Sequence, residues 1–209
     1  VISGFDLNLC TWKKIGLVTY LKITFSSTSI QECDIGIRLA VDEFGCGTGN
    51  LTSRFPETAR VRAIDYSPIA ITKAKRKTNG NVRFFVMNFY EQQPNGYKPD
   101  RIVACRSLYH GDLSRSLGIL SEHLGDEGDV VVVHPSEDWK KYITPNMNGR
   151  RSFDFVQFMK SIGRLTNHFN VPYALFSADE FERAGRQHFD EVEVNSSAYD
   201  THYLIHLRK

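Results

Sequence analysis

A glycine-rich turn that directly follows a short apolar run is the feature that most constrains the fold of this chain. The run spans residues 39–44, and glycines follow at Gly45, Gly47 and Gly49. Glycine is needed where the backbone turns sharply, or where a ligand approaches the backbone without interference from a Cβ atom. A strand that passes through such a turn into a helix is typical of the first unit of an open α/β sheet.

Strand-like and helix-like segments alternate from about residue 40 onward. The apolar runs predict strands at 39–44, 61–65, 82–87, 101–105, 130–133, 192–195 and 202–207. Helical spacing and cap residues predict helices at 50–56, 67–79, 113–124 and 177–185. At the start of the last helix, Ser177 and Glu180 form a capping box, and Phe176 and Phe181 are placed for a hydrophobic staple. Strands separated by helices pair in parallel, and the last two strands should pair antiparallel. We therefore expect an α/β fold with a doubly wound, mostly parallel sheet and an antiparallel edge strand.

An acidic residue at the end of the second predicted strand adds a functional signal to the glycine turn. Asp65 follows Gly49 by 16 residues, and a carboxylate in this place can accept hydrogen bonds from both ribose hydroxyls of an adenosine. The spacing G-x-G-x-G differs from the dinucleotide pattern, because Asn50 stands where a third glycine would be needed. No G-K-[ST] follows, so a P-loop is excluded. A purely structural strand-to-helix connection remains the alternative.

The chain resembles the class I S-adenosylmethionine (SAM)-dependent methyltransferases in several segments between residues 40 and 134. Residues 41–49 (VDEFGCGTG) resemble motif I, 63–68 (AIDYSP) the following acidic motif, and 87–89 (MNF) the third. Residues 100–103 and 124–129 resemble the start of the fourth strand and the turn before the fifth. The resemblance implies a Rossmann-like fold and SAM as cofactor, held by Glu43, Gly45, Cys46, Gly47, Gly49, Asp65, Tyr66, Asn88 and Phe89. Glu43 and Asn88 stand where the family usually has Asp.

The region after the fourth predicted strand carries the clues to the methyl acceptor. It contains neither an Asn-Pro-Pro-aromatic tetrapeptide nor a Pro-Cys dipeptide, which base methyltransferases carry. Residues 104–110 are similar to a segment of small-molecule methyltransferases, especially the juvenile hormone acid O-methyltransferase group. The resemblance implies a small-molecule carboxylate as acceptor, with Arg106, Tyr109 and His110 as candidate catalytic residues. Arg106 can bind a carboxylate in a bidentate manner, or form an ordinary ion pair.

The aromatic segment 135–176 is the second clue to the acceptor. It follows the fifth predicted strand and is expected to cap the crevice as part of a single domain 1–209, with an atypical N-terminal segment at 1–38. Trp139 and Tyr142 are the candidate pocket walls for substrate. A small satellite core under a long loop is the alternative. A methyltransferase acting on RNA or protein, and a non-catalytic or truncated SAM-fold protein, also stay open.

Charge and cysteine usage narrow the remaining function classes. The net charge is +2, which does not favour a nucleic-acid partner, and the basic run at 73–77 is interpreted as a solvated helix face. Four widely spaced cysteines without a C-x-x-C motif indicate reduced thiols in a cytoplasmic protein. No metal site is expected, although His202 and His206 share one strand face, and no apolar run is long enough for a membrane span. The sequence leaves the oligomeric state open.

Overall fold

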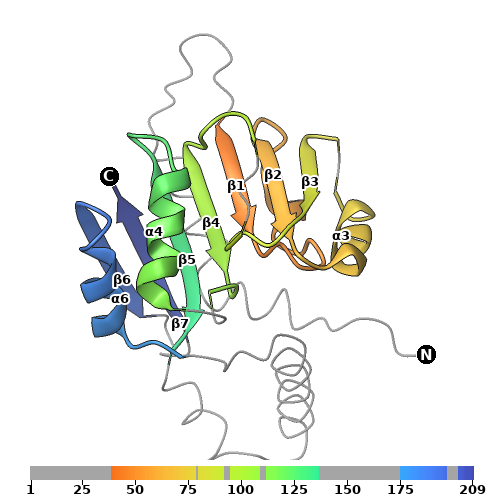
Figure 1. Cartoon of the computed structure of the whole chain (residues 1–209). Coiled ribbons are helices and arrows are strands. Elements are labelled where there is room, and N and C mark those ends of the chain that lie inside the picture. Colours follow the sequence, from red (N-terminus) through yellow and green to blue (C-terminus); the bar gives the residue numbers. More distant parts are fainter. Residues whose placement is uncertain (1–38, 79, 92–94, 109–111, 137–174, 197–201) are drawn as a thin grey trace, which may run out of the picture.

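The computed structural model describes residues 39–78, 80–91, 95–108, 112–136, 175–196 and 202–209. In these residues seven strands form one sheet in the order β3-β2-β1-β4-β5-β7-β6 (Figure 1). The strands are β1 (Ala40–Phe44), β2 (Arg60–Asp65), β3 (Val82–Val86), β4 (Arg101–Cys105), β5 (Asp129–Pro135), β6 (Glu191–Ser196) and β7 (His202–Arg208). The helical elements are the 3-10 turn η1 (Thr52–Arg54) and the α-helices α3 (Pro68–Lys75), α4 (Leu113–His123) and α6 (Ala178–Gly185).

The pairing of the strands confirms the predicted fold class. Strands β1 to β5 pair in parallel, and β7 runs antiparallel to both β5 and β6. Parallel pairing requires a crossover between consecutive strands, whereas a short connection such as 197–201 allows an antiparallel return. The result is a mostly parallel sheet with an antiparallel return at one edge.

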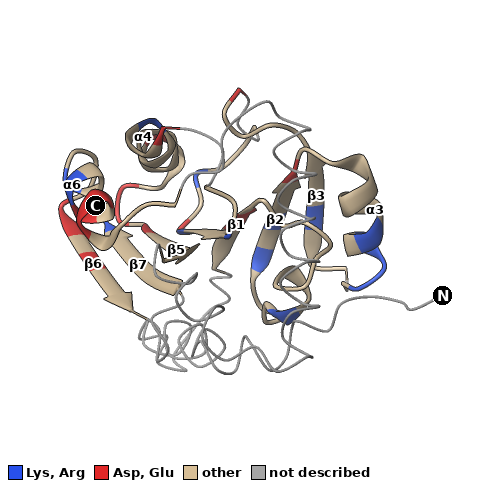
Figure 2. Cartoon of the chain, turned by 90° about the horizontal axis from the view of Figure 1, so that it is seen from below, with Lys and Arg blue, Asp and Glu red and all other residues tan. Residues whose placement is uncertain are grey.

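The two faces of the sheet are covered by different helices. Consecutive residues of a strand point to opposite faces. On β2, Ile64 packs into the core cluster that contains Leu117 of α4, whereas its neighbour Ala63 packs with Ile71 of α3. Figures 1 and 2 show α4 and α6 side by side on one face. The sheet is therefore doubly wound, as predicted.

Local cap residues explain where two of the helices begin. Ser67 accepts a hydrogen bond from the Ala70 N–H (3.2 Å), with Pro68 in the first turn, so α3 begins where predicted. At α6 the predicted capping box is confirmed: Ser177 Oγ accepts from the Glu180 N–H (3.2 Å), and the Glu180 carboxylate accepts from the Ser177 N–H (2.7 Å). The ring of Phe176 lies 6.0 Å from that of Phe181, as the staple requires.

Two predicted helices are shorter than expected. The segment 50–56 contains only the turn η1, because Phe55 is extended before Pro56 and the residue before a proline disfavours helical geometry. Helix α3 ends at Lys75 instead of near residue 79. Beyond its end, Lys77 turns back and donates to the side chain of Asn50 (2.6 Å).

The functional part of the sheet lies where β1 and β4 are neighbours. The chain leaves β1 toward β2 and leaves β4 toward β5, in opposite directions along the sheet. Open α/β proteins bind ligands in the crevice at the carboxyl ends of strands at such a switch point. No helix in the described residues is long and apolar enough to cross a membrane.

Candidate active site

The glycine loop after β1 adopts a backbone that explains its composition. Gly45, Gly47 and Gly49 have φ angles of +76°, +54° and +77°, which side chains disfavour. A Cβ atom at Gly45 would lie 2.3 Å from the Cβ of Ser107, and one at Gly49 would lie 2.8 Å from the Cα of Ala74. No described residue would lie within 4 Å of a Cβ atom at Gly47. Gly45 and Gly49 are thus required for packing, whereas no described residue packs against Gly47 in this way.

The carboxylate of Asp65 joins the end of β2 to this loop. Its Oδ2 accepts a hydrogen bond from the Gly47 N–H (2.8 Å), and its Oδ1 accepts from the Ser67 N–H (2.9 Å). Burial raises the pKa of Asp65, and the two backbone N–H groups oppose that rise. Each carboxylate oxygen has a further lone pair that can accept a second hydrogen bond. The structure therefore brings together the glycine turn and the acid that the sequence placed 16 residues apart.

Glu43 lies beneath the loop and not on its surface. Its side chain is buried, and its Oε2 accepts a hydrogen bond from the Thr52 hydroxyl of η1 (2.6 Å). Burial raises the pKa of Glu43 to about 8, the Thr52 hydroxyl opposes the rise, and the nearby Asp65 charge adds to it. Glu43 is thus mainly protonated at neutral pH. Sequence reasoning missed Thr52, because no motif signals a hydroxyl nine residues downstream.

Cys46 is a packing residue of the loop. Its side chain is buried in a small cluster with Ala63 and Ile71, and burial raises the pKa of its thiol. A thiolate is the nucleophilic form of cysteine, so a raised pKa opposes reactivity. Cys46 therefore acts as a small apolar filler of the turn, and any contact with a cofactor would use its backbone.

The residues that follow β2 and β3 differ in how they are exposed. Tyr66 is 39% exposed at the end of β2, next to Asp65. Asn88 follows β3, and its Oδ1 accepts a hydrogen bond from the Tyr90 N–H (3.1 Å). Phe89 is buried, with its ring 5.1 Å from Phe44 and 4.2 Å from Tyr90. Tyr66 and Asn88 thus remain accessible candidates, whereas the ring of Phe89 belongs to the core.

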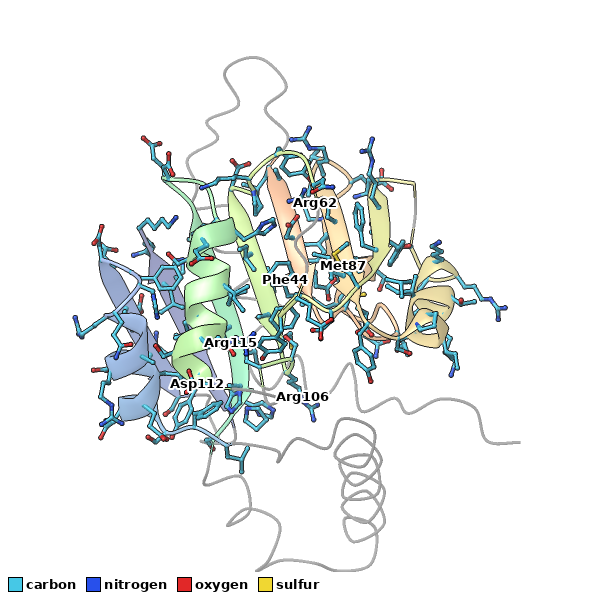
Figure 3. The ribbon with its side chains drawn as sticks, in the orientation of Figure 1. Phe44, Arg62, Met87, Arg106, Asp112 and Arg115 are labelled. Atoms are coloured by element: carbon cyan, nitrogen blue, oxygen red, sulfur yellow. The ribbon has the colours of Figure 1, made fainter. Side chains whose placement is uncertain are left out.

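Arg106 marks the carboxyl end of β4 (Figure 3). It adopts a φ of +54°, which is unusual for a residue with a side chain, and its N–H donates to the Val133 carbonyl (2.8 Å). Burial, and secondarily the Arg106 charge, lower the pKa of His134 to about 4 and that of His202 to about 3. At pH 7 both imidazoles are therefore neutral, while the Arg106 guanidinium keeps its charge. Sequence reasoning did not connect these two histidines with Arg106.

Four predicted site residues lie outside the described residues: Tyr109, His110, Trp139 and Tyr142. The proposed cap 135–176 and the segment 1–38 lie mostly or entirely outside them as well. The described residues hold no group of three or more metal-ligating side chains. His206 instead bonds Asp129 (2.6 Å) at the far end of β7 from His202.

The strand order is that of the class I methyltransferase fold. Residues 43–130 match the family model described as Methyltransferase domain, so the match covers the glycine loop, Asp65 and the strands β2 to β4. No curated protein sequence matches the chain.

Solved structures share this fold at low sequence identity. The citrinin polyketide synthase CMeT domain superposes with a TM-score of 0.67 and 16% identity over 92% of this chain, which spans only 52% of that chain. The N-methyltransferase NodS from Bradyrhizobium japonicum WM9 superposes with a TM-score of 0.62 and 16% identity, over 98% of this chain and 99% of NodS. The magnesium protoporphyrin IX methyltransferase ChlM from Synechocystis PCC 6803 superposes with a TM-score of 0.59 and 16% identity, over 99% of this chain and 90% of ChlM. At such identity the likeness establishes the fold and leaves the acceptor open.

Proposed function

We propose that this protein transfers a methyl group from SAM to a carboxylate of a small molecule. The observation that carries the first half of the proposal is the 2.8 Å hydrogen bond between the Gly47 N–H and the Asp65 carboxylate, at the sheet's switch point. It joins the glycine turn to an acceptor of hydroxyl groups, inside the region that matches the Methyltransferase domain model.

The residues around Gly47 fit an adenosine with a sulfonium side chain. The open space above Gly47 lets the cofactor approach the backbone. Asp65 would accept the ribose hydroxyls with its remaining lone pairs, Tyr66 would pack on the adenine, and Asn88 would meet the adenine amino group. Structures of NodS and ChlM contain S-adenosyl-L-homocysteine, the demethylated product of SAM, which supports SAM as the donor here.

The chemistry requires mainly that an acceptor is held in line with the methyl group. When bound, SAM supplies a methyl group that its positively charged sulfur already activates. The chain then has to position the nucleophile, which can supply several kcal/mol of rate enhancement. A carboxylate needs no general base at neutral pH, because its ordinary pKa is about 4.

Arg106 is the described residue best suited to hold that carboxylate. It follows β4, and its neighbour Ser107 packs against Gly45 of the glycine loop, so Arg106 stands beside the cofactor site. The neutral state of His134 and His202 keeps further positive charge from building up near it. Guanidinium geometry suits bidentate carboxylate binding. Tyr109, His110, Trp139 and Tyr142 complete the proposed acceptor site from outside the described residues.

A product test separates this proposal from other methyl acceptors. Carboxylic acids would be screened with methyl-labelled SAM, and the products treated with base, which releases the label from methyl esters only. A base-labile product supports the proposal; a base-stable product would show transfer to another atom.

The Arg106→Met variant tests the role of the guanidinium. Loss of its charge-assisted hydrogen bonds should raise the acceptor KM about 10- to 100-fold, with an unchanged Kd for SAM. Arg106→Lys is the matched control, because it keeps the charge but loses the bidentate geometry. Its acceptor KM should lie between that of the original chain and that of Arg106→Met. An unchanged KM in Arg106→Met would remove Arg106 from the acceptor site.

A further inference from the structure

The charged side chains of the segment that forms the β3 edge are all positive. Residues 66–90 contain five Lys and Arg residues and no Asp or Glu. These residues form α3, β3 and their connections, at the end of the sheet farthest from β6 (Figures 1 and 2). The cations are Lys73, Lys75, Arg76, Lys77 and Arg83. An acidic partner is therefore favoured at this edge over a basic one.

The backbone at this edge is open to a further strand. β3 pairs with β2 from Val82 to Val86, and no strand of the described residues pairs with its other side. An unpaired strand edge presents N–H and C=O groups that an extended segment can bind. Among the described residues, β3 is the unpaired edge strand that cationic side chains border.

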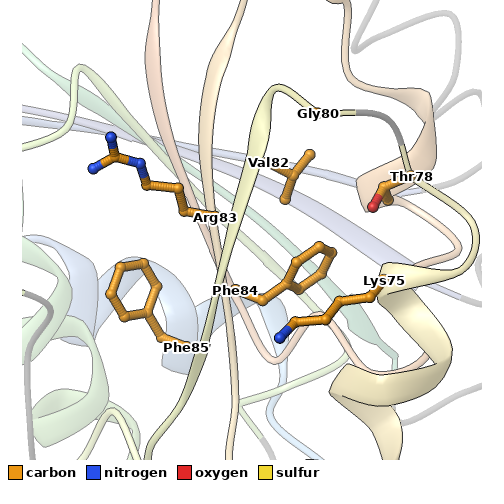
Figure 4. A pocket seen from close by; sticks show the side chains of 7 residues that line it. All are labelled: Lys75, Thr78, Gly80, Val82, Arg83, Phe84 and Phe85. Carbon is orange, nitrogen blue, oxygen red and sulfur yellow. The ribbon is translucent and has the colours of Figure 1, made fainter.

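Apolar surface accompanies the charges. A groove of about 590 Å³ borders β3 and is lined by Lys75 and Arg83 with Val82, Phe84 and Phe85 (Figure 4). Phe84 and Phe85 are successive strand residues, so they point to opposite faces. Figure 4 shows Lys75 with Phe84 on one side of β3, and Arg83 with Phe85 on the other. Each face of the edge thus pairs a cation with an aromatic ring.

Two further apolar side chains of α3 and β3 are exposed. Ile69 in the first turn of α3 is 69% exposed, and Val86 at the end of β3 is 53% exposed. With Tyr66, they are the large hydrophobic residues that the described part of the chain leaves exposed. Apolar side chains gathered on one edge mark an interaction site more than scattered ones do.

We propose that the β3 edge is a docking site for a partner protein that adds an extended acidic and apolar segment as a strand beside β3. The partner backbone pairs with the open edge, its carboxylates meet Lys75 and Arg83, and its apolar side chains contact Phe84 and Phe85. A second copy of this chain would bring the same cations against one another, so the charges oppose self-association through β3. This inference does not depend on the proposed methyl acceptor.

The test uses a probe peptide whose pattern follows from the two faces. In the sequence Glu-Glu-Val-Val-Glu-Glu-Val-Val, each face of the strand alternates acidic and apolar residues, as the edge requires. Binding to the full chain would be measured by fluorescence anisotropy, with amide chemical shifts to locate it. We expect binding that shifts the amides of residues 82–86. An otherwise identical peptide with N-methyl groups on alternate backbone nitrogens should bind about tenfold more weakly, because it cannot pair as a strand.

Charge reversal provides the matched protein control. The double variant Lys75→Glu with Arg83→Glu changes two exposed side chains, so its Tm and its affinity for SAM should stay unchanged. It should bind the acidic peptide about tenfold more weakly, and it should bind the corresponding lysine peptide better than the original chain does.

Four results would overturn the proposal. They are no binding of the acidic peptide at millimolar concentration, equal binding of the N-methylated peptide, tighter binding of an RNA octamer at the same residues, and dimerisation of the free chain through β3 in light scattering with cross-linking. The second result would indicate general anion attraction, and the third a nucleic-acid site.

Discussion

Gly45, Gly47 and Gly49 look equivalent in the sequence, but their surroundings separate packing from ligand access. Cβ atoms at Gly45 and Gly49 would collide with Ser107 and with the α3 backbone, respectively. Of the three, Gly47 is the one at which the part of the chain that the structure describes places no atom near the missing side chain. Gly47 is therefore the glycine of the three that we expect to contact a ligand, and its N–H also donates to Asp65.

Gly47→Ala should consequently affect binding more than folding. Its φ of +54° should cost alanine roughly 1–2 kcal/mol of stability, without a steric clash. The methyl group would occupy the cofactor's approach, so we expect the Kd for SAM to rise at least about tenfold, equal to about 1.4 kcal/mol. Calorimetry and urea unfolding measure the two effects. Gly80→Ala, which also meets open space but lies far from the loop, should leave the Kd unchanged; equal Kd values for both variants would contradict the cofactor assignment.

Glu43 should make stability depend on pH. Its pKa is raised from 4.5 to about 8 in the folded protein. Between these values the folded state holds a proton that the unfolded state releases, so the free energy of unfolding falls as pH rises, by up to about 1.4 kcal/mol per pH unit. Glu43→Gln removes this pH dependence. The free energy of unfolding of the variant should therefore rise relative to that of the original chain from pH 5 to pH 8. Parallel pH curves from chemical denaturation for both proteins would mean that Glu43 is ionised throughout.

At the scale of elements, an ion pair joins β1 to β2 inside the sheet. Asp42 and Arg62 are register partners and form two hydrogen bonds of 2.6 Å, both side chains being buried. His123 of α4 contacts Asp42 (2.7 Å), and Arg62 also donates to the carbonyl of Tyr97 (2.9 Å). Arg62 lies toward the amino end of the strands, away from Arg106 (Figure 3). The network thus holds β1 and β2 in register and does not form part of the candidate active site.

Removing one charge of this pair should be costly. Asp42→Asn leaves the Arg62 charge buried, and we expect a loss of about 3–5 kcal/mol in the free energy of unfolding. The double variant Asp42→Leu with Arg62→Leu removes both charges and should recover a substantial part of that loss. Urea denaturation measures both. A loss below about 1 kcal/mol, the value of a surface ion pair, would show that water reaches the pair.

Sequence patterns predicted the elements because their signals are local. The Ser67 cap, the Ser177–Glu180 box and the apolar runs depend on residues a few positions apart, and the structure contains each of them. The ends of α3 and η1 were wrong, since tertiary contacts of Lys77 and the backbone before Pro56 decide them. The Asp42–Arg62 pair could not be predicted in this way, because aligning the carboxyl ends of the two predicted strands pairs Asp42 with Ala63, one residue away from the observed register.

At the scale of the whole molecule, strand order places distant residues in one crevice. The switch point between β1 and β4 brings the glycine loop next to Ser107 and Arg106, which lie about 60 positions later in the chain. The sequence could nominate Asp65 and Arg106 because motifs precede them. It could not predict Thr52 as the partner of Glu43, or His134 and His202 as neighbours of Arg106, since these interactions depend on packing between elements that no motif links.

Calorimetric titration of SAM into the Asp65→Asn variant measures whether Asp65 and the Gly47 turn form a SAM site. Loss of the charge-assisted hydrogen bonds should weaken binding by about 1.5–3 kcal/mol, while the exposed-site control Asp126→Asn binds as the original chain does. Melting curves verify that both variants are folded. A folded Asp65→Asn protein with an unchanged Kd would show that Asp65 does not hold the cofactor.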